Sequence, residues 1–223
     1  MGKKCLLVFV KYPEAGKVKT RLAVDIGDQK AVAVYKCMVE DLMATVKKLD
    51  MSVIVCYDPK ESGLSMMKWL GAGPRYYAQT GADLGEKLEN AFYHAYSKNF
   101  TDVAVIGSDT PDLSVTQINE AFDYLNQTEA VIGPANDGGY YLLGFNRGGF
   151  FLDVFKNIPW STDMVYVETW SKIRKSGKVC EVLSEWNDVD TIFDLEDLYK
   201  KNKDTWFKDS KTMQWIRNDG MFD

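Results

Sequence analysis

The sequence predicts an α/β fold in which a mostly parallel central sheet carries helices on both faces. Short apolar runs alternate with longer segments whose apolar residues recur at helical spacing. The run "CLLVFV" at residues 5–10 is apolar throughout, as expected of a strand that is buried on both faces. No Pro/Gly/Ser-rich linker, repeat or low-complexity segment divides the chain. We therefore expect residues 1–223 to form a single domain.

The expected elements follow one another along the chain. Apolar runs predict strands at 5–10, 51–57, 75–79, 102–107, 129–134, 139–145 and 178–183. Helical spacing predicts helices at 28–49, 84–96, 114–125, from Ser161 or Thr162 to about 176, and 191–201. The helix after Ser114 begins with a capping box, because Gln117 stands three residues later. The segment from residue 202 onward has no clean periodicity and receives no assignment.

The composition is that of a folded globular protein and excludes several classes. The chain is 46% hydrophobic and 26% charged, which is too apolar for a disordered segment. Its net charge of -5 argues against nucleic-acid binding, which needs a basic surface. The N-terminal apolar run ends at Val10, too early for a membrane span or a secretory signal, so we expect a cytoplasmic protein. The four cysteines form no CxxC motif, which argues against zinc.

A basic segment, "KYPEAGKVKTRL" at 11–22, follows the first expected strand. Ligands of open α/β sheets bind outside the carboxyl ends of the strands. Lys11, Lys19 and Arg21, in a loop that Gly16 makes flexible, indicate a site for phosphate groups. The loop is not a Walker A motif, because Val18 stands where that motif has Ser or Thr. A basic loop that is merely solvated explains the composition equally well.

A second glycine-rich segment, "TGADLGEKL" at 80–88, opens a helix. Asp83 lies between Gly81 and Gly85 and is well placed to cap that helix. The two glycines also allow the backbone to lie close to a nucleobase or ribose, so both interpretations stay open here.

Two acidic residues at expected strand ends are candidates for a metal site. Ser108 and Asp109 follow the strand at 102–107, and a carboxylate there suits a hard cation such as Mg²⁺. Asp190, in "NDVDTIFDL", is either the N-cap of the next helix or a second ligand for the same ion. Asp112 is better explained as part of the turn that leads into the Ser114 cap.

Candidates for the second substrate come from the C-terminal half. "GPANDGGYYLLG" places Asp137 beside Gly138 and Gly139, which either form a hairpin turn or bring backbone close to a ligand. Asp137 is a candidate general base. Trp160 either lines an acceptor pocket or packs in the core.

Taken together and in this order, these motifs resemble the GT-A-fold nucleotide-diphospho-sugar transferase-like family. "GPANDGGYYLLG", "PWSTDMV" and "DVDTIFDL" carry the resemblance together with "KYPEAGKVKTRL", "GADLGEKL" and "IGSDTPDL". The family includes bacterial glycosyltransferases linked to arsenosugar biosynthesis, and it is related to the nucleotidyltransferases of the molybdenum cofactor and of deazaflavin.

The resemblance implies a nucleotide-binding N-terminal half and an acceptor-binding C-terminal half. Asp109 corresponds to the metal-binding acid of a DxD motif, although the residues here are Ser108, Asp109 and Thr110. Lys87 stands where the family pattern has Arg, which keeps the charge but loses the planar fork.

Three functions are therefore expected, in order of preference. The first is transfer of a sugar from a nucleotide-sugar to a small-molecule acceptor, with Mg²⁺ or Mn²⁺ at Asp109 and Asp190 neutralising the leaving diphosphate. The second is nucleotidyl transfer from an NTP with release of pyrophosphate. The third is nucleotide binding without catalysis, which the single acid in "SDT" favours.

Overall fold

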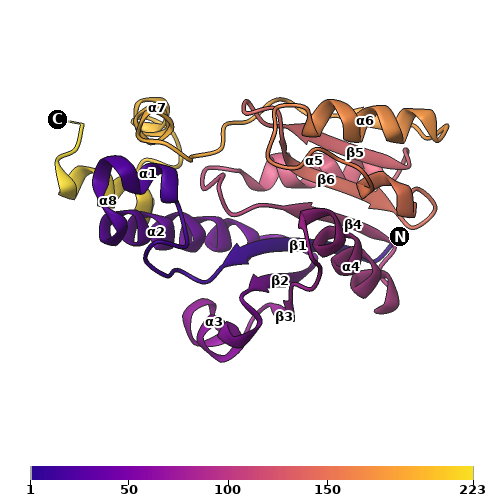
Figure 1. Cartoon of the computed structure of the whole chain (residues 1–223), viewed down its shortest axis with the longest axis horizontal. Coiled ribbons are helices and arrows are strands. Elements are labelled where there is room, and N and C mark those ends of the chain that lie inside the picture. Colours follow the sequence, from indigo (N-terminus) through magenta and orange to yellow (C-terminus); the bar gives the residue numbers. More distant parts are fainter. Residues whose placement is uncertain (1, 223) are drawn as a thin grey trace.

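A seven-stranded sheet runs through the centre of the chain in the computed structural model, which describes residues 2–222 (Figure 1). The strand order is β3-β2-β1-β4-β6-β5-β7. β6 is antiparallel to both of its neighbours, β4 and β5, and every other pairing is parallel. The predicted α/β class with a mostly parallel sheet is confirmed.

The elements have the following bounds. The strands are β1 (Lys4–Lys11), β2 (Ser52–Asp58), β3 (Arg75–Ala78), β4 (Asp102–Ile106), β5 (Ala130–Pro134), β6 (Tyr140–Asn146) and β7 (Cys180–Val182). The helices are α1 (Thr20–Ile26), α2 (Asp28–Val46), α3 (Gly63–Leu70), α4 (Leu84–Ser97), α5 (Val115–Leu125), α6 (Val165–Lys175), α7 (Ile192–Asn202) and α8 (Lys211–Asp219). Two short 3-10 turns, η1 (Lys60–Ser62) and η2 (Leu152–Phe155), complete the set.

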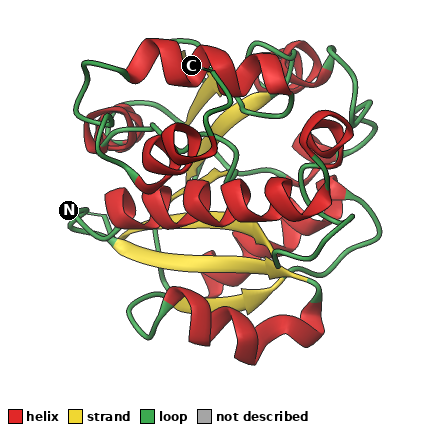
Figure 2. Cartoon of the chain, turned by 90° about the vertical axis from the view of Figure 1, so that its left-hand side faces the viewer, coloured by secondary structure: helices red, strands yellow, loops and turns green. Residues whose placement is uncertain are grey.

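The two faces of the sheet bury two separate cores. Along β1, Leu6 and Val8 point to one face, where α2, α3 and α5 pack, and Cys5 and Leu7 point to the other, where α4 and α6 pack. Successive side chains of a strand alternate between faces, so one apolar strand supplies both cores. Figure 2 shows the strands enclosed between helices.

A third cluster of buried residues joins four helices beside the carboxyl end of β1. Leu22 of α1 packs with Met38 of α2, Leu195 of α7 and Met213 of α8. In Figure 1 these helices lie together on the left, next to the C-terminus. This cluster fixes α1, and the loop before it, against the segment that leads into α7.

The expected strands match the observed ones to within two residues, whereas the helices differ more. The helix expected at Ser161 or Thr162 begins only at Val165, with Met164 as its N-cap, so that expectation is wrong. Ser161 has a φ of 65°, outside the helical region, and the Thr162 hydroxyl donates to the Pro159 carbonyl. Three helices were not expected at all: α1, α3 and α8.

Candidate functional site

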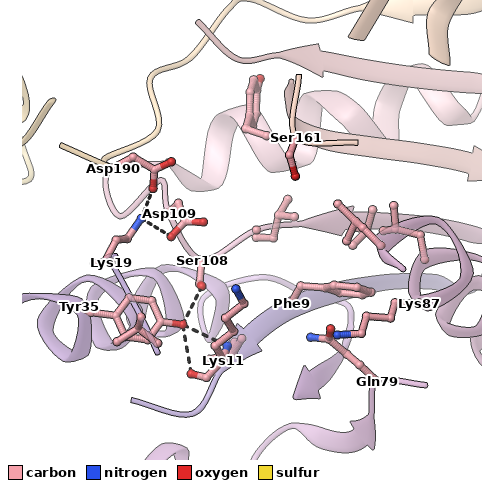
Figure 3. A pocket seen from close by; sticks show the side chains of 18 of the residues that line it. Phe9, Lys11, Lys19, Tyr35, Gln79, Lys87, Ser108, Asp109, Ser161 and Asp190 are labelled. Atoms are coloured by element: carbon pink, nitrogen blue, oxygen red, sulfur yellow. Dashed lines mark hydrogen bonds and ion pairs between the residues drawn. The ribbon is translucent and has the colours of Figure 1, made fainter. Parts of the chain in front are cut away.

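One cavity of about 570 Å³ opens at the carboxyl ends of β1 and β4 (Figure 3). Its walls come from the loop after β1, from the start of α4 and from the segment after β4. Six of the residues predicted to bind ligand line it: Lys11, Lys19, Arg21, Asp83, Ser108 and Asp109, and Asp190 joins them from the segment before α7. The main cations and acids predicted from the sequence therefore lie together at the carboxyl edge of the sheet.

Strand register and one buried tyrosine hold the ends of β1 and β4 together. Val8 of β1 lies opposite Ile106, the last residue of β4, so β1 extends three residues further. The Tyr35 hydroxyl of α2 accepts from the Lys11 amide and donates to the Lys11 carbonyl, each at 3.1 Å. A phenol has only one proton, so Ser108 Oγ, also 3.1 Å away, is the donor of that third bond. Burial raises the pKa of Tyr35, which keeps the hydroxyl neutral.

Lys19 stands between the two predicted metal ligands. Its Nζ forms ion pairs with Asp109 Oδ1 and, at 2.8 Å, with Asp190 Oδ1. Figure 3 shows the ammonium pointing into the gap between the two carboxylates. Asp109 and Asp190, hereafter the acid pair, are thus bridged by a cation that the chain itself supplies.

The ion pairs outweigh the effect of burial at this point. Burial alone favours the neutral amine of Lys19, but the acid pair raises the pKa of Lys19 above its ordinary value. Burial would also raise the pKa of Asp190, but the cations of Lys19 and Arg21 lower it. Lys19 and Asp190 are therefore both charged at neutral pH.

Backbone contacts explain why Asp190 reaches a residue so distant in sequence. The Val189 amide donates to the Asp109 carbonyl at 2.9 Å and docks the segment before α7 onto the end of β4. Thr191, not Asp190, is the N-cap of α7, and it forms a capping box with Asp194. Of the two interpretations of Asp190, the N-cap one is wrong, and its carboxylate faces the cavity instead.

A further acid, Asp188, lies close to the acid pair. Its burial, together with the negative charges of Asp109 and Asp137, raises the pKa of Asp188 to about 8. The local negative charge is thus only partly balanced by Lys19, and this region favours an additional cation.

The residues present fit a divalent cation only in part. Within residues 2–222, no three His, Cys, Asp or Glu side chains converge as metal ligands. Mg²⁺, however, often takes only one or two protein carboxylates and completes its shell with water and phosphate oxygens. The acid pair supplies that number of ligands, and the Lys19 ammonium now lies between them.

The opposite end of the cavity has different chemistry. Figure 3 shows Phe9, Gln79 and Lys87 at some distance from Lys19 and the acid pair. Gln79 Nε2 donates to the Cys56 carbonyl at 2.8 Å, which fixes the amide and leaves its oxygen as an acceptor. An aromatic ring and a fixed amide acceptor suit a flat, polar-edged group such as a nucleobase.

The "GADLGEKL" segment combines both of its interpretations. Asp83 caps α4 by accepting from the Glu86 amide at 2.9 Å, and it also lines the cavity. Gly81 and Gly85 do not line it. A Cβ at Gly85 would lie 2.9 Å from the Phe155 carbonyl oxygen and 3.0 Å from Trp160 Nε1. Gly85 therefore serves the packing of α4, and its role toward a nucleotide stays a prediction.

The residues predicted for the acceptor lie outside the cavity lining. Asp137 and Gly138 form the turn between β5 and β6, so the hairpin interpretation is confirmed. The Asp137 carboxylate is exposed and accepts from the Gly139 amide at 2.8 Å. Trp160 packs against the core on the α4 side of the sheet. Roles of these residues toward an acceptor remain predictions from the sequence alone.

Several residues of the site were missed. Tyr35 was assigned to the apolar face of a helix, although a buried tyrosine there needs a partner for its hydroxyl. Phe9 and Gln79 lie at the ends of expected strands and carried no motif. Arg21 was placed in a loop, but it lies in the first turn of α1, whose N-cap is Lys19.

The family model described as "Uncharacterized protein conserved in bacteria (DUF2064)" matches residues 41–162, just over half of the chain. No curated protein sequence matches this chain. No helix in residues 2–222 has the length and apolar character needed to cross a membrane.

Several solved structures resemble this chain over most of its length. A protein of Desulfovibrio desulfuricans G20, described as a "putative nucleotide-diphospho-sugar transferase", is 39% identical, with a TM-score of 0.96 over 100% of this chain and 97% of that chain. A 4-diphosphocytidyl-2C-methyl-D-erythritol synthase of Anaerococcus prevotii DSM 20548 is 13% identical, with a TM-score of 0.56 over 86% of this chain and 94% of its own. Rv0371C of Mycobacterium tuberculosis H37Rv, solved with manganese, is 16% identical, with a TM-score of 0.54 over 89% and 98%.

The last two likenesses, at 13% and 16% identity, concern the fold alone. The first extends over the whole length of the chain and, with the family match, settles its membership. This chain belongs to the DUF2064 family and is a nucleotide-diphospho-sugar transferase-like protein with the corresponding α/β fold.

Proposed function

We propose that this chain transfers the sugar of a nucleotide-diphospho-sugar to a small-molecule acceptor. The observation that carries the proposal is the cavity itself, where a cationic loop faces the acid pair at the carboxyl edge of the sheet. Such an arrangement holds phosphates between fixed charges and leaves the far end of the cavity for a base. The description of the 39% identical protein supports the same reaction class.

The diphosphate would lie along the basic loop. Lys11 and Lys17 line the cavity and form no ion pair within residues 2–222, so both ammonium groups are available to phosphate oxygens. Arg21 lies 3.9 Å from Asp190 and is 70% exposed, which leaves most of its donors free. The nucleobase would lie toward Phe9 and Gln79.

The reaction breaks the bond between the anomeric carbon and the diphosphate oxygen. The acceptor hydroxyl oxygen bonds to that carbon, its proton passes to solvent, and the nucleoside diphosphate leaves. Lys11, Lys17 and Arg21 stabilise the negative charge that develops on the leaving group. Asp109 and Asp190 would hold Mg²⁺ or Mn²⁺, which adds positive charge at the same phosphates. Asp137 does not line the cavity, and we assign it no step.

Nucleotidyl transfer is the second candidate, and the number of cations favours it. Lys11, Lys17 and Arg21 line the cavity in addition to the paired Lys19 and Lys87, and these three cations exceed the two negative charges of a diphospho-sugar. The fold is shared with a 4-diphosphocytidyl-2C-methyl-D-erythritol synthase. In this reaction an acceptor oxygen would attack the α-phosphorus of an NTP, and pyrophosphate would leave.

The products distinguish the two reactions. Panels of UDP-, GDP-, ADP- and CDP-sugars and of NTPs are first tested for stabilisation of the protein against thermal unfolding, with and without Mn²⁺. The stabilising nucleotides are then incubated with candidate acceptors, and the products are identified by mass spectrometry. We expect a nucleoside diphosphate together with a glycosylated acceptor. Release of pyrophosphate would contradict sugar transfer, and tight nucleotide binding without any product would leave the non-catalytic function.

A further inference from the structure

The burial of Lys19 is unusual for a lysine at the edge of a ligand cavity. Its side chain is 3% exposed, whereas those of its partners Asp109 and Asp190 are 42% and 38% exposed. The Lys19 side chain is therefore almost fully covered, although it lines the cavity, whereas the two carboxylates stay partly exposed. Lysine side chains are seldom so buried unless they are paired.

The backbone at Lys19 is adapted to this placement. Lys19 is the N-cap of α1 with φ 47° and ψ 43°, a left-handed conformation that L-residues other than Asn and Asp rarely adopt. Its side chain forms no capping hydrogen bond, because an ammonium cannot accept from the helix amides. The first amides of α1 therefore have no acceptor from the N-cap side chain, and the Lys19 ammonium contacts the two carboxylates instead.

The point that Nζ fills is also the point where the two carboxylates converge. One Asp190 oxygen lies at 2.8 Å from Nζ and one Asp109 oxygen contacts the same atom, so a single cation reaches both. A Mg²⁺ ion bound to both would need oxygens at about 2.0–2.1 Å and would leave no room for an ammonium. Lysine and metal therefore exclude each other at the acid pair.

We propose that Lys19 is a tethered cation that occupies the divalent-metal position of the acid pair in the nucleotide-free protein. Incoming phosphates draw the Lys19 ammonium away, and only then does the acid pair accept Mg²⁺ or Mn²⁺. The flexible four-carbon stem of lysine permits this exchange without a change of fold. The inference rests on the proposed function only in assigning the incoming anion to a nucleotide.

Removing the tethered cation should therefore create a metal site. We expect Lys19→Met to bind Mn²⁺ alone, without nucleotide, at least tenfold more tightly than the wild type, measured by isothermal titration calorimetry or by the electron paramagnetic resonance of free Mn²⁺. Lys17→Met is the matched control, because it removes one positive charge from the same loop but no ion pair with the acid pair. It should change Mn²⁺ affinity less than threefold.

The second variant tests whether the gained site is the acid pair. Adding Asp190→Asn to Lys19→Met should abolish the gain, and Mn²⁺ should raise the melting temperature of Lys19→Met but not that of the double variant. Equal Mn²⁺ affinity of Lys19→Met and Lys17→Met, with both variants folded by circular dichroism, would overturn the proposal. Because Mn²⁺ is the only probe, this outcome does not depend on which transfer reaction the protein catalyses.

Discussion

The phosphate side of the proposed site, at Lys19 and the acid pair, and its proposed acceptor side, at the β5–β6 turn outside the cavity lining, are held in different ways. On the phosphate side, Lys11, Lys19 and Ser108 are fixed by side-chain bonds that join β1, α2 and the end of β4. On the acceptor side, Asp137 is bonded only to the Gly139 amide within its own turn. Groups that bind a charged ligand are preorganised by neighbours distant in sequence. The turn is also docked, because the Gly138 carbonyl accepts from the Tyr166 amide at 2.8 Å, but the Asp137 carboxylate has no such distant partner within residues 2–222.

Asp109→Asn and Asp137→Asn test this difference most strongly. We expect Asp109→Asn to lower kcat because it weakens the proposed metal site, by about 10²- to 10³-fold, the usual cost of removing one preorganised electrostatic contribution. Asp137→Asn should lower kcat by less than about tenfold, since a general base contributes 10² or more and Asp137 does not line the cavity. Steady-state kinetics with the substrates found in the product assay give both values. Equal losses would show that the β5–β6 turn takes part in catalysis.

Glycines on the two sides are required for different reasons, and substitution by alanine should destabilise the protein to different extents. At Gly138 φ is +86° and a Cβ would lie 2.3 Å from the Asp163 carbonyl oxygen, so Gly138→Ala should cost about 2–4 kcal/mol of unfolding free energy. At Gly16 φ is +74° but the nearest atom is 3.9 Å away, so Gly16→Ala should cost only about 1–2 kcal/mol. Urea unfolding of both variants measures the difference. A larger loss at Gly16 would mean that the basic loop is the more tightly packed of the two.

The Tyr35 hydroxyl links Lys11 of β1 to Ser108, which follows β4, and its removal should lower the free energy of unfolding. Tyr35→Phe leaves the Lys11 amide and carbonyl without that partner, at a cost of about 1–3 kcal/mol. Tyr140→Phe is the matched control, because the Tyr140 hydroxyl is buried and has no hydrogen-bond partner within residues 2–222. It should cost nothing or be slightly stabilising. A loss of stability in Tyr140→Phe equal to that in Tyr35→Phe would argue that the Lys11 contacts contribute little.

Part of the fold and part of the candidate site could be predicted from the sequence. The seven strands were predictable because continuous apolar runs have few alternatives to burial on both faces of a sheet. The placement of Lys11, Asp109 and Asp190 around one cavity was predictable because parallel strands present their carboxyl ends at one edge. The antiparallel direction of β6 could not be predicted, since an apolar pattern does not encode the direction of a strand.

The unpredicted parts have two physical reasons. α1 and α3 are only 7 and 8 residues long, so too few apolar positions repeat to reveal a period. The bridge from Lys19 to Asp190 joins residues 171 positions apart, and it depends on side-chain geometry that only the folded chain defines. Spacing along the sequence placed both residues at one edge of the sheet but not in contact.

The smallest expected effect concerns Asp188, which lies between the two sides. Its pKa of about 8 in the folded protein is above the ordinary 3.8, so the folded state holds a proton that the unfolded state loses near pH 4. The stability that this proton contributes is complete below pH 4 and is lost as the pH rises toward 8. Asp188→Asn removes the titration, so its melting temperature relative to that of the wild type should rise with pH between pH 5 and 8.5.

Asp204→Asn, which changes an exposed acid far from the cavity in sequence, is the control for this measurement and should show no such trend. The presence of this trend matters more than its size, because a carboxylate stabilised by Lys19 would titrate below pH 4 and give no trend between pH 5 and 8.5. If the stability of Asp188→Asn relative to the wild type does not change over this pH range, Asp188 is ionised in the folded protein. Lys19 would then balance three carboxylates rather than two, and the phosphate side would extend toward the turn that carries Asp137.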